Sequence, residues 1–507
     1  MDLKAFLTES FSSPLFIIST FIFLLFIIKQ TKNLFVNKIQ NLPPGPPKFP
    51  IIGNLLQVGD KVHESLAKFA EEYGPLISLQ LGSQILVVAS SPEAAMGILK
   101  TQDRFLSSRS VPTALDHKSL LSHSIFWSVC NETWRMLRTL CRTEFFSPQA
   151  LETHSSLRIE KMDKMLSFLN SKQGEVINTQ DIVFTTLFNT LSCIIFGKDL
   201  LDIEKENGTC TGLKASIFMI LEYGARVKDF GSFFPIFNEL DLQGIRKGGR
   251  KHIQEVFDYW KDIIDDRRRA HFKPTTLLSE QKTTFLDRLI DVGFTNDQIN
   301  EYITELFVAG SNTTTTAVVW AMTELVKNKE VMIKIEEEMK REIETDKISE
   351  SQLYKLPYLK ACVKESFRLH APVPFLLPRL ANQTCEVMNY TIPKYARVFV
   401  NVWAMGRDPK VWDEPLCFKP ERFIDSKTDF KGHNYELLPF GSGRRMCPGL
   451  PLGSLDLEFI LASLIHEFDW VLPNNEDPMK IDMNDKFLLT LRKEKHLELI
   501  FKRKRGS

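Results

Sequence analysis

Apolar residues form long runs along much of this chain, and their spacing favours helices over strands. Residues 301–327 and 450–468 are each long and apolar enough for a buried helix, and residues 150–295 repeat helical patterns between loops. Residues 85–89 form a short apolar run that suits a buried strand. The pattern therefore predicts a mainly α-helical fold with a small β portion.

The most apolar run lies near the N-terminus, at residues 11–28. As a helix it spans roughly 27 Å at about 1.5 Å per residue, close to the thickness of the bilayer core. The run lacks the basic start and the small-residue cleavage site of a signal peptide. We therefore predict a membrane anchor rather than a cleaved leader.

The flanks of this run set its orientation and divide the chain. Lys29, Lys32 and Lys38 follow the run, whereas the residues before it carry a net negative charge. The positive-inside rule then places the bulk of the chain in the cytosol. We expect a lumenal N-terminus, a transmembrane anchor, a basic and proline-rich hinge, and one cytosolic domain, over residues 1–10, 11–28, 29–50 and 51–507.

Composition narrows the class of protein. Of the 507 residues, 43% are hydrophobic and 25% are charged, as in a globular protein with a sizeable core. The 64 basic and 63 acidic residues leave a net charge of +1, so we expect no nucleic-acid partner. The 8 cysteines show no paired, zinc-like spacing and are predicted to be reduced thiols, with Cys447 set apart by its context.

Cys447 lies in residues 440–449, which read Phe-Gly-Ser-Gly-Arg-Arg-Met-Cys-Pro-Gly. A cysteine at the start of a helix, beside cationic side chains, has its thiolate favoured by the helix dipole, by N–H groups and by positive charge. The glycines let the backbone approach a flat object, Arg445 can pair with an anion, and Phe440 can cover the sulfur. A buried iron porphyrin with propionates would satisfy all of these features.

The pattern Phe-x-x-Gly-x-Arg-x-Cys-x-Gly resembles the haem-binding loop of the cytochrome P-450 family of haem-thiolate monooxygenases. The resemblance covers nearly the whole chain, and an anchor followed by a proline-rich hinge is typical of the microsomal members. It implies the cytochrome P-450 fold, as a single large domain after one N-terminal transmembrane helix. It also implies haem b with iron on the Cys447 thiolate, and NADPH used only indirectly, through the reductase.

The resemblance implies which other side chains hold the haem. Trp134 and Arg138 share one face of a helical pattern and match a tryptophan and an arginine that hold a propionate in the family. Arg379 and Arg445 match two further propionate positions, and Phe440 matches the position beside the sulfur. Without the resemblance, an amphipathic surface helix would be the preferred interpretation of the first pair.

Residues 309–314 read Ala-Gly-Ser-Asn-Thr-Thr within a long helical pattern. Glycine and consecutive threonines weaken a helix, and the hydroxyls can bond to carbonyls one turn earlier. The segment resembles the oxygen-activation motif of the family, with Thr313 at the catalytic threonine and Ala309 at the pocket wall. Asn312 replaces the usual acid, and an amide cannot relay a proton as a carboxylic acid can.

Two interpretations of Asn312 stay open. In the first, a chain of water molecules compensates for the missing acid and ordinary monooxygenation continues. In the second, proton delivery is altered, which favours phenol coupling, ring closure or rearrangement without net oxygen insertion.

Glu365 and Arg368 are spaced to meet on one helical face, and Arg422 follows in the sequence Pro-Glu-Arg-Phe. An exposed pair of this kind would contribute only about 0–1 kcal/mol. The three residues together match the buried Glu-Arg-Arg triad of the family, for which we expect a structural role.

Two stretches resemble segments that line the substrate pocket in the family. In a proline-stiffened stretch we expect Phe375, Leu376 and Leu377 to form apolar walls, although a buried strand is a competing interpretation. Near the C-terminus, Leu488 replaces the glycine of a second such segment and should add bulk near the substrate.

The expected function is the oxidation of an apolar plant specialised metabolite, an alkaloid or a terpenoid. Residues 141–148 and 241–245 resemble stretches of plant members that oxidise monoterpenoids and benzylisoquinoline-type alkaloids. The expected partners are NADPH–cytochrome P-450 reductase, dioxygen, a small apolar substrate and the endoplasmic reticulum membrane. The alternatives are a haem-thiolate oxidase that couples or rearranges its substrate, and a non-catalytic, membrane-anchored haem-binding protein.

Overall fold

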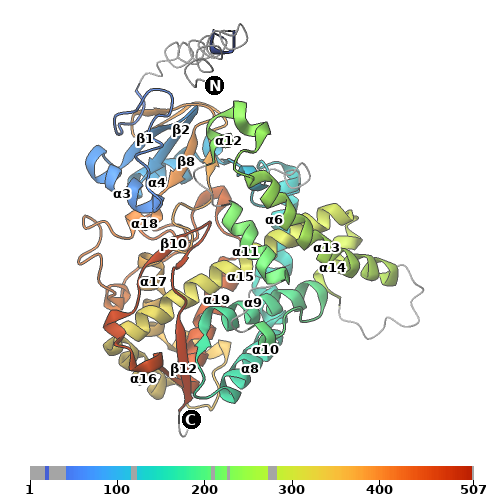
Figure 1. The fold of residues 1–507 in the computed structure, drawn as a ribbon. Helices are drawn as coiled ribbons and strands as arrows, with labels where there is room; N and C mark the ends of the chain where they lie inside the picture. Colours follow the sequence, from blue (N-terminus) through green and yellow to red (C-terminus); the bar gives the residue numbers. More distant parts are fainter. Residues whose placement is uncertain are drawn as a thin grey trace, which may run out of the picture.

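The computed structural model describes residues 18–21, 41–115, 123–206, 212–224, 229–271 and 283–504. Within these ranges helices dominate and the strands form small sheets, so the predicted mainly α-helical fold with a small β portion is confirmed (Figure 1). The predicted lumenal segment and most of the predicted hinge lie outside the described residues. So does the predicted anchor, apart from a short helical piece at residues 18–21.

The helices, in chain order, are α3 (Val62–Tyr73), α4 (Pro92–Met96), α5 (Asp103–Leu106), α6 (Glu132–Cys141), α7 (Pro148–Thr153), α8 (Ser155–Ser171), α9 (Thr179–Phe196), α10 (Ile203–Glu206), α11 (Gly212–Gly224), α12 (Phe230–Phe233), α13 (Ile245–His271), α14 (Phe285–Asp291), α15 (Asn296–Lys327), α16 (Lys329–Glu342), α17 (Pro357–Leu369), α18 (Val402–Met405) and α19 (Leu450–Glu467). The strands are β1 (Leu76–Leu81), β2 (Gln84–Ala89), β3 (Ser108–Arg109), β4 (Ile177–Asn178), β5 (Arg379–Leu380), β6 (Cys385–Val387), β7 (Tyr390–Ile392), β8 (Arg397–Val400), β9 (Phe468–Val471), β10 (Asp485–Phe487), β11 (Leu491–Lys493) and β12 (Glu498–Arg503). The predicted helices at 301–327 and 450–468 and the predicted strand at 85–89 correspond to α15, α19 and β2.

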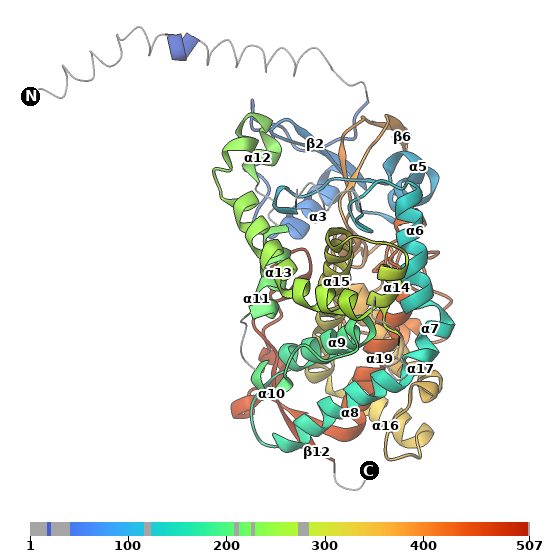
Figure 2. The same ribbon diagram turned by 90° about the vertical axis from the view of Figure 1, so that its right-hand side faces the viewer.

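Helix α15 runs through the middle of the helical part (Figures 1 and 2). Its start is fixed by a capping box, in which the side chains of Thr295 and Gln298 each accept a bond from the other residue's backbone N–H. Most of its residues are buried, and it packs against α9, α13, α17 and α19. This packing outweighs the low helix propensity of Gly310 and of the four threonines that follow Asn312.

Helix α9 is a core element as well. Among the described residues it is the one helix long and apolar enough to cross a membrane, but 89% of it is buried inside the protein. It packs against α15 and α8. Its apolar composition therefore follows from its position in the core.

The largest sheet has the strand order β1-β2-β8-β5-β3. It lies near the described N-terminal residues, at the top of Figure 1. The proline-rich end of the predicted hinge runs beside β1, where the Ser78 N–H donates to the Pro44 carbonyl at 2.8 Å. A Cβ atom at Gly45 would lie 2.0 Å from the Ser78 carbonyl oxygen, so only glycine fits this contact.

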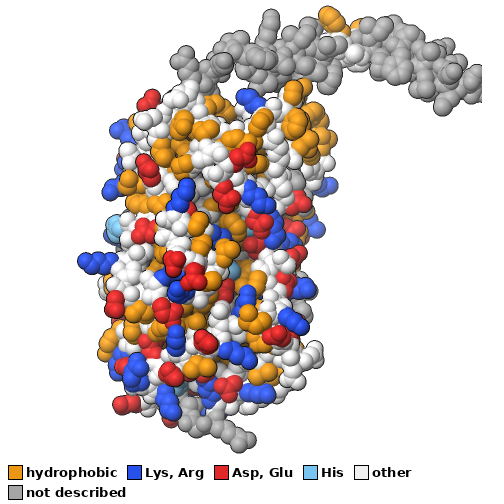
Figure 3. Space-filling view, turned by 90° about the vertical axis from the view of Figure 1, so that its left-hand side faces the viewer, with side chains coloured by type: hydrophobic (Ala, Val, Ile, Leu, Met, Phe, Trp, Pro, Cys, Tyr) orange, Lys and Arg blue, Asp and Glu red, His pale blue; other side chains and the backbone are white. Residues whose placement is uncertain are grey.

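Acidic and basic side chains interleave over the face shown in Figure 3, in keeping with a net charge near zero. Exposed apolar side chains occur on two segments that meet at the β1–β2 turn. Here the Gly82 N–H donates to the Ile52 carbonyl at 3.2 Å, and the Ser83 N–H donates to the Phe233 carbonyl at 2.9 Å. The exposed apolar residues of the two segments are Phe49, Ile51, Leu56, Phe230, Ile236, Phe237, Leu240 and Leu242.

Candidate active site

One internal cavity, of about 280 Å³, gathers most of the predicted site residues. Cys447 lines it from the loop before α19, and Thr313 lines it from α15. The other predicted residues on its walls are Ala309, Arg138, Arg379, Arg445, Phe440, Leu376 and Leu377. Trp134 lies just behind them, with its ring 4.9 Å from the Arg445 guanidinium.

The loop of residues 440–449 holds Cys447 by backbone hydrogen bonds. The Cys447 N–H donates to the Phe440 carbonyl at 3.0 Å, which closes the loop. Burial raises the pKa of the Cys447 thiol, whereas bonds from the Gly449 and Leu450 N–H groups and the charge of Arg138 oppose that rise. The predicted supporting groups are present but do not outweigh burial, so the thiol form is favoured until a metal cation at the sulfur stabilises the thiolate.

Gly443 and Gly449, two of the three glycines of this loop, have different surroundings. Gly443 has a φ of +73°, and a Cβ atom there would lie 2.1 Å from the Leu99 carbonyl oxygen in the π-helical turn Gly97–Thr101. A Cβ at Gly449 would have no neighbour closer than 3.6 Å. A side chain at Gly443 is therefore excluded by the backbone of Leu99, and the predicted approach of the loop to a flat ligand stays a prediction.

Four arginines converge on the cavity from separate elements. Arg109 in β3 lies directly opposite Arg379 in β5, as a cross-strand pair. Arg138 comes from α6, and Arg445 from the 3-10 turn Gly443–Arg445. All four line the cavity. Like charges directly opposite one another weaken a strand pair, so this arrangement favours an anion between them.

The cluster has little negative charge of its own. Among the described residues, one of the four arginines forms an ion pair with a carboxylate: Arg379 Nη1 lies 2.9 Å from Asp103 Oδ1. The other three arginines donate to backbone carbonyls of described residues. Arg109 donates to Phe126 and Leu377, and Arg138 donates to Met446. Arg445 donates to Ser107, Ile125 and Ser128.

Burial and mutual repulsion both act on these guanidinium groups. Burial lowers the pKa of Arg109 well below its ordinary value, and the charges of Arg379 and Arg445 lower it further. Burial also lowers the pKa of Arg445 to about 10. Buried charges of one sign are costly unless an opposite charge meets them. The two propionates of a haem would supply it, so the cluster fits that cofactor.

Arg109 is a residue that sequence reasoning missed. It lies in the stretch Ser-Ser-Arg-Ser-Val, which matches no haem-binding motif, and its strand is only two residues long. Its role becomes visible only through its pairing with Arg379, which is far away in the sequence.

A buried carboxyl group, Glu305 on α15, was also missed. Its Oε2 accepts a bond from the Ile125 N–H at 2.8 Å, and its Oε1 accepts one from the Ser124 hydroxyl. Burial raises the pKa of Glu305 to about 8, despite these hydrogen bonds. The carbonyl of the same Ile125 accepts from Trp134 Nε1 at 2.9 Å and from Arg445 at 3.2 Å. One loop residue thus links α15 to the arginine cluster.

The hydroxyl groups of α15 bond back to their own helix, as predicted. Thr313 Oγ1 donates to the Ala309 carbonyl at 2.6 Å, and Thr315 Oγ1 donates to the Ser311 carbonyl at 2.7 Å. Gly310 lines the cavity, and a Cβ there would lie 2.7 Å from Leu191 Cδ1 of α9. Glycine at this position thus lets α9 and α15 pack closely.

Asn312 is not among the residues that line the cavity. Its side chain is 2% exposed, and Nδ2 donates to Thr490 Oγ1 at 3.0 Å. Thr490 belongs to the turn between β10 and β11 and lines the cavity. Asn312 therefore reaches the cavity through another side chain.

The predicted pocket residues divide between two cavities. Leu376 and Leu377 line the main cavity, whereas Phe375 and Leu488 line an adjoining cavity of about 100 Å³. The ring of Phe375 packs on that of Phe399 in β8, with 5.0 Å between centroids, which turns it away from the main cavity. Leu376 lines both cavities. The predicted pocket residues therefore lie close together but do not enclose a single cavity.

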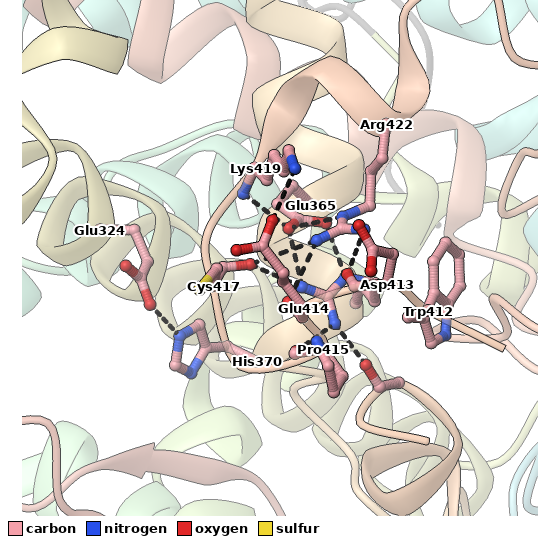
Figure 4. A network of polar contacts seen from close by, with 12 residues as sticks. Glu324, Glu365, His370, Trp412, Asp413, Glu414, Pro415, Cys417, Lys419 and Arg422 are labelled. Carbon is pink, nitrogen blue, oxygen red and sulfur yellow. Dashed lines mark hydrogen bonds and ion pairs between the residues drawn. The ribbon is translucent and has the colours of Figure 1, made fainter. Parts of the chain in front are cut away.

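The residues of the predicted triad meet in a buried cluster (Figure 4). Arg368 forms a two-bond pair with Glu365, with both N–O distances at 2.7 Å, and Arg422 Nε lies 3.0 Å from Glu365 Oε1. Further N–H groups of Arg368 donate to the carbonyls of Gly406, Pro415 and Cys417. The adjacent Phe367 lines the cavity and packs edge-on against Phe440, with 5.2 Å between ring centroids.

Comparison with known proteins places this chain. The sequence profile described as Cytochrome P450 matches residues 43–500. A Coptis japonica protein named "Probable (S)-N-methylcoclaurine 3'-hydroxylase isozyme 2" is 45% identical over 96% of both chains. Corytuberine synthase of the same plant is 41% identical over 90% of this chain and 92% of its own. Geraniol 8-hydroxylase of Catharanthus roseus is 38% identical over 96% and 98%. The chain belongs to the cytochrome P450 family of haem-thiolate monooxygenases.

Proposed function

We propose that this protein oxidises a small, apolar plant specialised metabolite, an alkaloid or a terpenoid, with dioxygen and reductase-supplied electrons. The observation that carries this proposal is the placement of Cys447 and Thr313 on one largely apolar cavity beside four arginines. Relatives named as hydroxylases of N-methylcoclaurine and of geraniol support both substrate classes. Apolar residues on the cavity walls include Leu115, Phe126, Phe145, Leu187, Leu191, Ile220, Leu306 and Val308.

Haem b, the cofactor of the family, would be bound at two places. Cys447 would hold the iron through its sulfur, and the cluster of Arg109, Arg138, Arg379 and Arg445, with Trp134 behind it, would hold the propionates. When bound, the haem supplies the activation of dioxygen. Phe440 would shield the sulfur from water, since its ring is fixed against Phe367 in the core.

On the distal wall, the residues of α15 would act on water and on the substrate. The Thr313 hydroxyl donates to the Ala309 carbonyl, so its oxygen lone pairs stay free to accept a bond from a proton-carrying water. Ala309, Leu376 and Leu377 would orient the substrate by apolar contact and exclude bulk water. Asn312 can orient a neighbouring group but cannot deliver a proton of its own.

Glu365, Arg368 and Arg422 would have a structural role. They fix α17 to the segment that leads to the cysteine loop, since the backbone N–H of Lys419 also donates to Glu365 Oε1 at 2.8 Å. Their charges face one another rather than the cavity, which argues against a part in the chemistry.

A second candidate function is oxidation without net oxygen insertion, by coupling or ring closure. Two observations favour it: Asn312 in place of an acid, and 41% identity to a relative named as a synthase rather than a hydroxylase. If Asn312→Asp leaves turnover, peroxide leakage and product ratio unchanged, altered proton delivery is not the cause of any unusual product.

The proposed setting is the endoplasmic reticulum membrane, with the reductase as electron donor. The apolar run at residues 11–28 supports a single-pass anchor, and the exposed apolar side chains near the β1–β2 turn support contact of that end with the membrane. Three exposed arginines belong to α6 or to the cysteine loop: Arg135 lies on α6, Arg142 at its C-terminal end, and Arg444 in the cysteine loop. They would receive an acidic face of the reductase.

The test is a microsomal assay with reductase and NADPH against a panel of benzylisoquinoline alkaloids and monoterpenols, scored by product mass. A gain of one oxygen means hydroxylation, and a loss of two hydrogens means coupling or ring closure. Cys447→Ala is the matched control and should abolish both products. Haem binding without any substrate-dependent NADPH consumption would favour a non-catalytic haem-binding protein.

A further inference from the structure

The turn between β10 and β11 separates the two cavities. Leu489 and Thr490 line the main cavity, whereas Phe487, Leu488 and Leu489 line the adjoining one. Its position therefore fixes both the width of the main cavity and the partition between the two spaces.

Three hydrogen bonds hold this turn to the rest of the protein. Two of them act at its end, where Trp320 Nε1 donates to the Leu491 carbonyl at 2.9 Å and the Leu491 N–H donates to the Pro372 carbonyl at 2.7 Å. The third acts on the part that lines the cavity, where Asn312 Nδ2 donates to Thr490 Oγ1 at 3.0 Å. Both of these side chains are buried, with 2% and 1% exposed.

The orientation of the Asn312 amide, with Nδ2 rather than Oδ1 toward Thr490, sets the direction of this third bond. An amide N–H can only donate, and it stays protonated at every working pH. The Thr490 oxygen accepts the bond, so the hydrogen of its own hydroxyl remains available to a neighbour. An ionised carboxylate at position 312 could only accept and would engage that hydrogen itself.

We propose that Asn312 is a positioning residue that acts through Thr490: it fixes the β10–β11 turn and leaves the Thr490 hydroxyl as a hydrogen-bond donor at the cavity wall. The matching substrate carries an acceptor oxygen, such as a phenol, a methoxyl or an alcohol. The substrate part of this inference rests on the proposed function, whereas the Asn312–Thr490 link does not.

The link itself can be tested on the haem-loaded enzyme without any substrate. Hydrogen exchange should be measured for a peptide covering residues 485–493 in Asn312→Ala, Thr490→Val and the double variant. Each single variant should exchange about 2- to 12-fold faster, as expected for one lost hydrogen bond, and the double variant no faster than either. Thr323→Val is the matched control, because it removes another buried hydroxyl of α15, one that bonds to the Val319 carbonyl of its own helix. Exchange equal to wild type in both single variants would overturn the link.

The substrate part needs optical titration of the ferric enzyme with (S)-N-methylcoclaurine, with geraniol and with imidazole. Asn312→Ala and Thr490→Val should each weaken binding of the ligand that the wild type accepts, with non-additive effects, and leave imidazole unchanged. Thr490→Ser, which keeps the hydroxyl, should bind more tightly than Thr490→Val. Equal weakening of imidazole, or equal binding by Ser and Val at position 490, would overturn the donor role. If neither alkaloid nor terpenol binds the wild type, the proposed substrate class fails while the exchange result stands.

Discussion

Two clusters of buried arginines in this protein differ in how their charge is balanced. In the cluster around Glu365, the carboxylate faces Arg368 and Arg422, and the remaining N–H groups meet backbone carbonyls. In the cluster around the cavity, Arg379 alone of the four arginines has a carboxylate partner among the described residues, Asp103, and the other three donate to backbone carbonyls. Both arginines of the first cluster contact a carboxylate, whereas three of the four in the second do not, which favours an anion from outside.

The difference separates a structural role from a binding role. A buried ion pair that is complete adds little net stability but becomes very costly when one partner is lost. A buried excess of one charge is costly from the start, and a ligand of opposite charge removes that cost. The presence or absence of a carboxylate beside each arginine therefore indicates that the Glu365 cluster holds the fold and that the cavity cluster holds a ligand.

The largest expected effect comes from removing the carboxylate of the Glu365 cluster. Glu365→Ala would leave Arg368 buried and unpaired, at a cost of about 3–5 kcal/mol, so we expect no folded, haem-loaded protein. The measurement is the yield of soluble protein with the absorbance of bound haem. Glu421→Ala, which breaks a half-exposed pair with Lys334 nearby, should cost only about 0–1 kcal/mol. Soluble, haem-loaded Glu365→Ala would contradict the structural role.

Haem should be retained less well when the arginine cluster around the cavity loses one of its charges. Arg109→Leu removes one arginine of the pair with Arg379, and we expect haem to be lost about tenfold faster or more, as for one charge-assisted bond. Transfer of haem to a scavenging protein measures the rate. Arg444→Leu is the control, because Arg444 is half-exposed and pairs with Asp103 outside the cavity. Equal rates in the two variants would remove Arg109 from the haem site.

Gly443 and Gly449 offer a smaller test of how the cysteine loop beside the cavity is held. A Cβ at Gly443 would collide with the Leu99 carbonyl and crowd Asp103, and the φ of +73° disfavours any side chain. We expect Gly443→Ala to lower the melting temperature of the enzyme by several degrees, as for a loss of about 1–3 kcal/mol. Gly449→Ala should lower it less, and a reversed order would contradict the packing described for the loop.

The last prediction concerns Glu305, a buried carboxyl group without the cationic partner that Glu365 has. Its pKa is raised to about 8 from an ordinary 4.5, so the folded state keeps a proton that the unfolded state loses. Stability from this group is full below pH 4.5 and falls as pH rises towards 8, by at most about 1.4 kcal/mol per unit. Glu305→Gln should therefore show a flatter decline in melting temperature between pH 6 and 8. Parallel curves for the two proteins would show that Glu305 is not protonated in the fold.

Sequence patterns predicted the long elements well, because their signals are local. The helix around Thr313 and the helix after Cys447 appear where their apolar runs predict them. The predicted pocket residues divide between two cavities, with Phe375 and Leu488 on the adjoining one. Which face of an irregular stretch turns inward depends on its neighbours, and no periodic pattern records that.

The sequence by itself determined the family, the cysteine loop and the triad, because each is a set of residue types at fixed short spacing. Only the tertiary structure placed Arg109 opposite Arg379, tied Glu305 to the loop of Ile125, and joined Asn312 to Thr490. These contacts link residues far apart in the chain. Their geometry is set by how helices and strands pack, which local residue spacing does not encode.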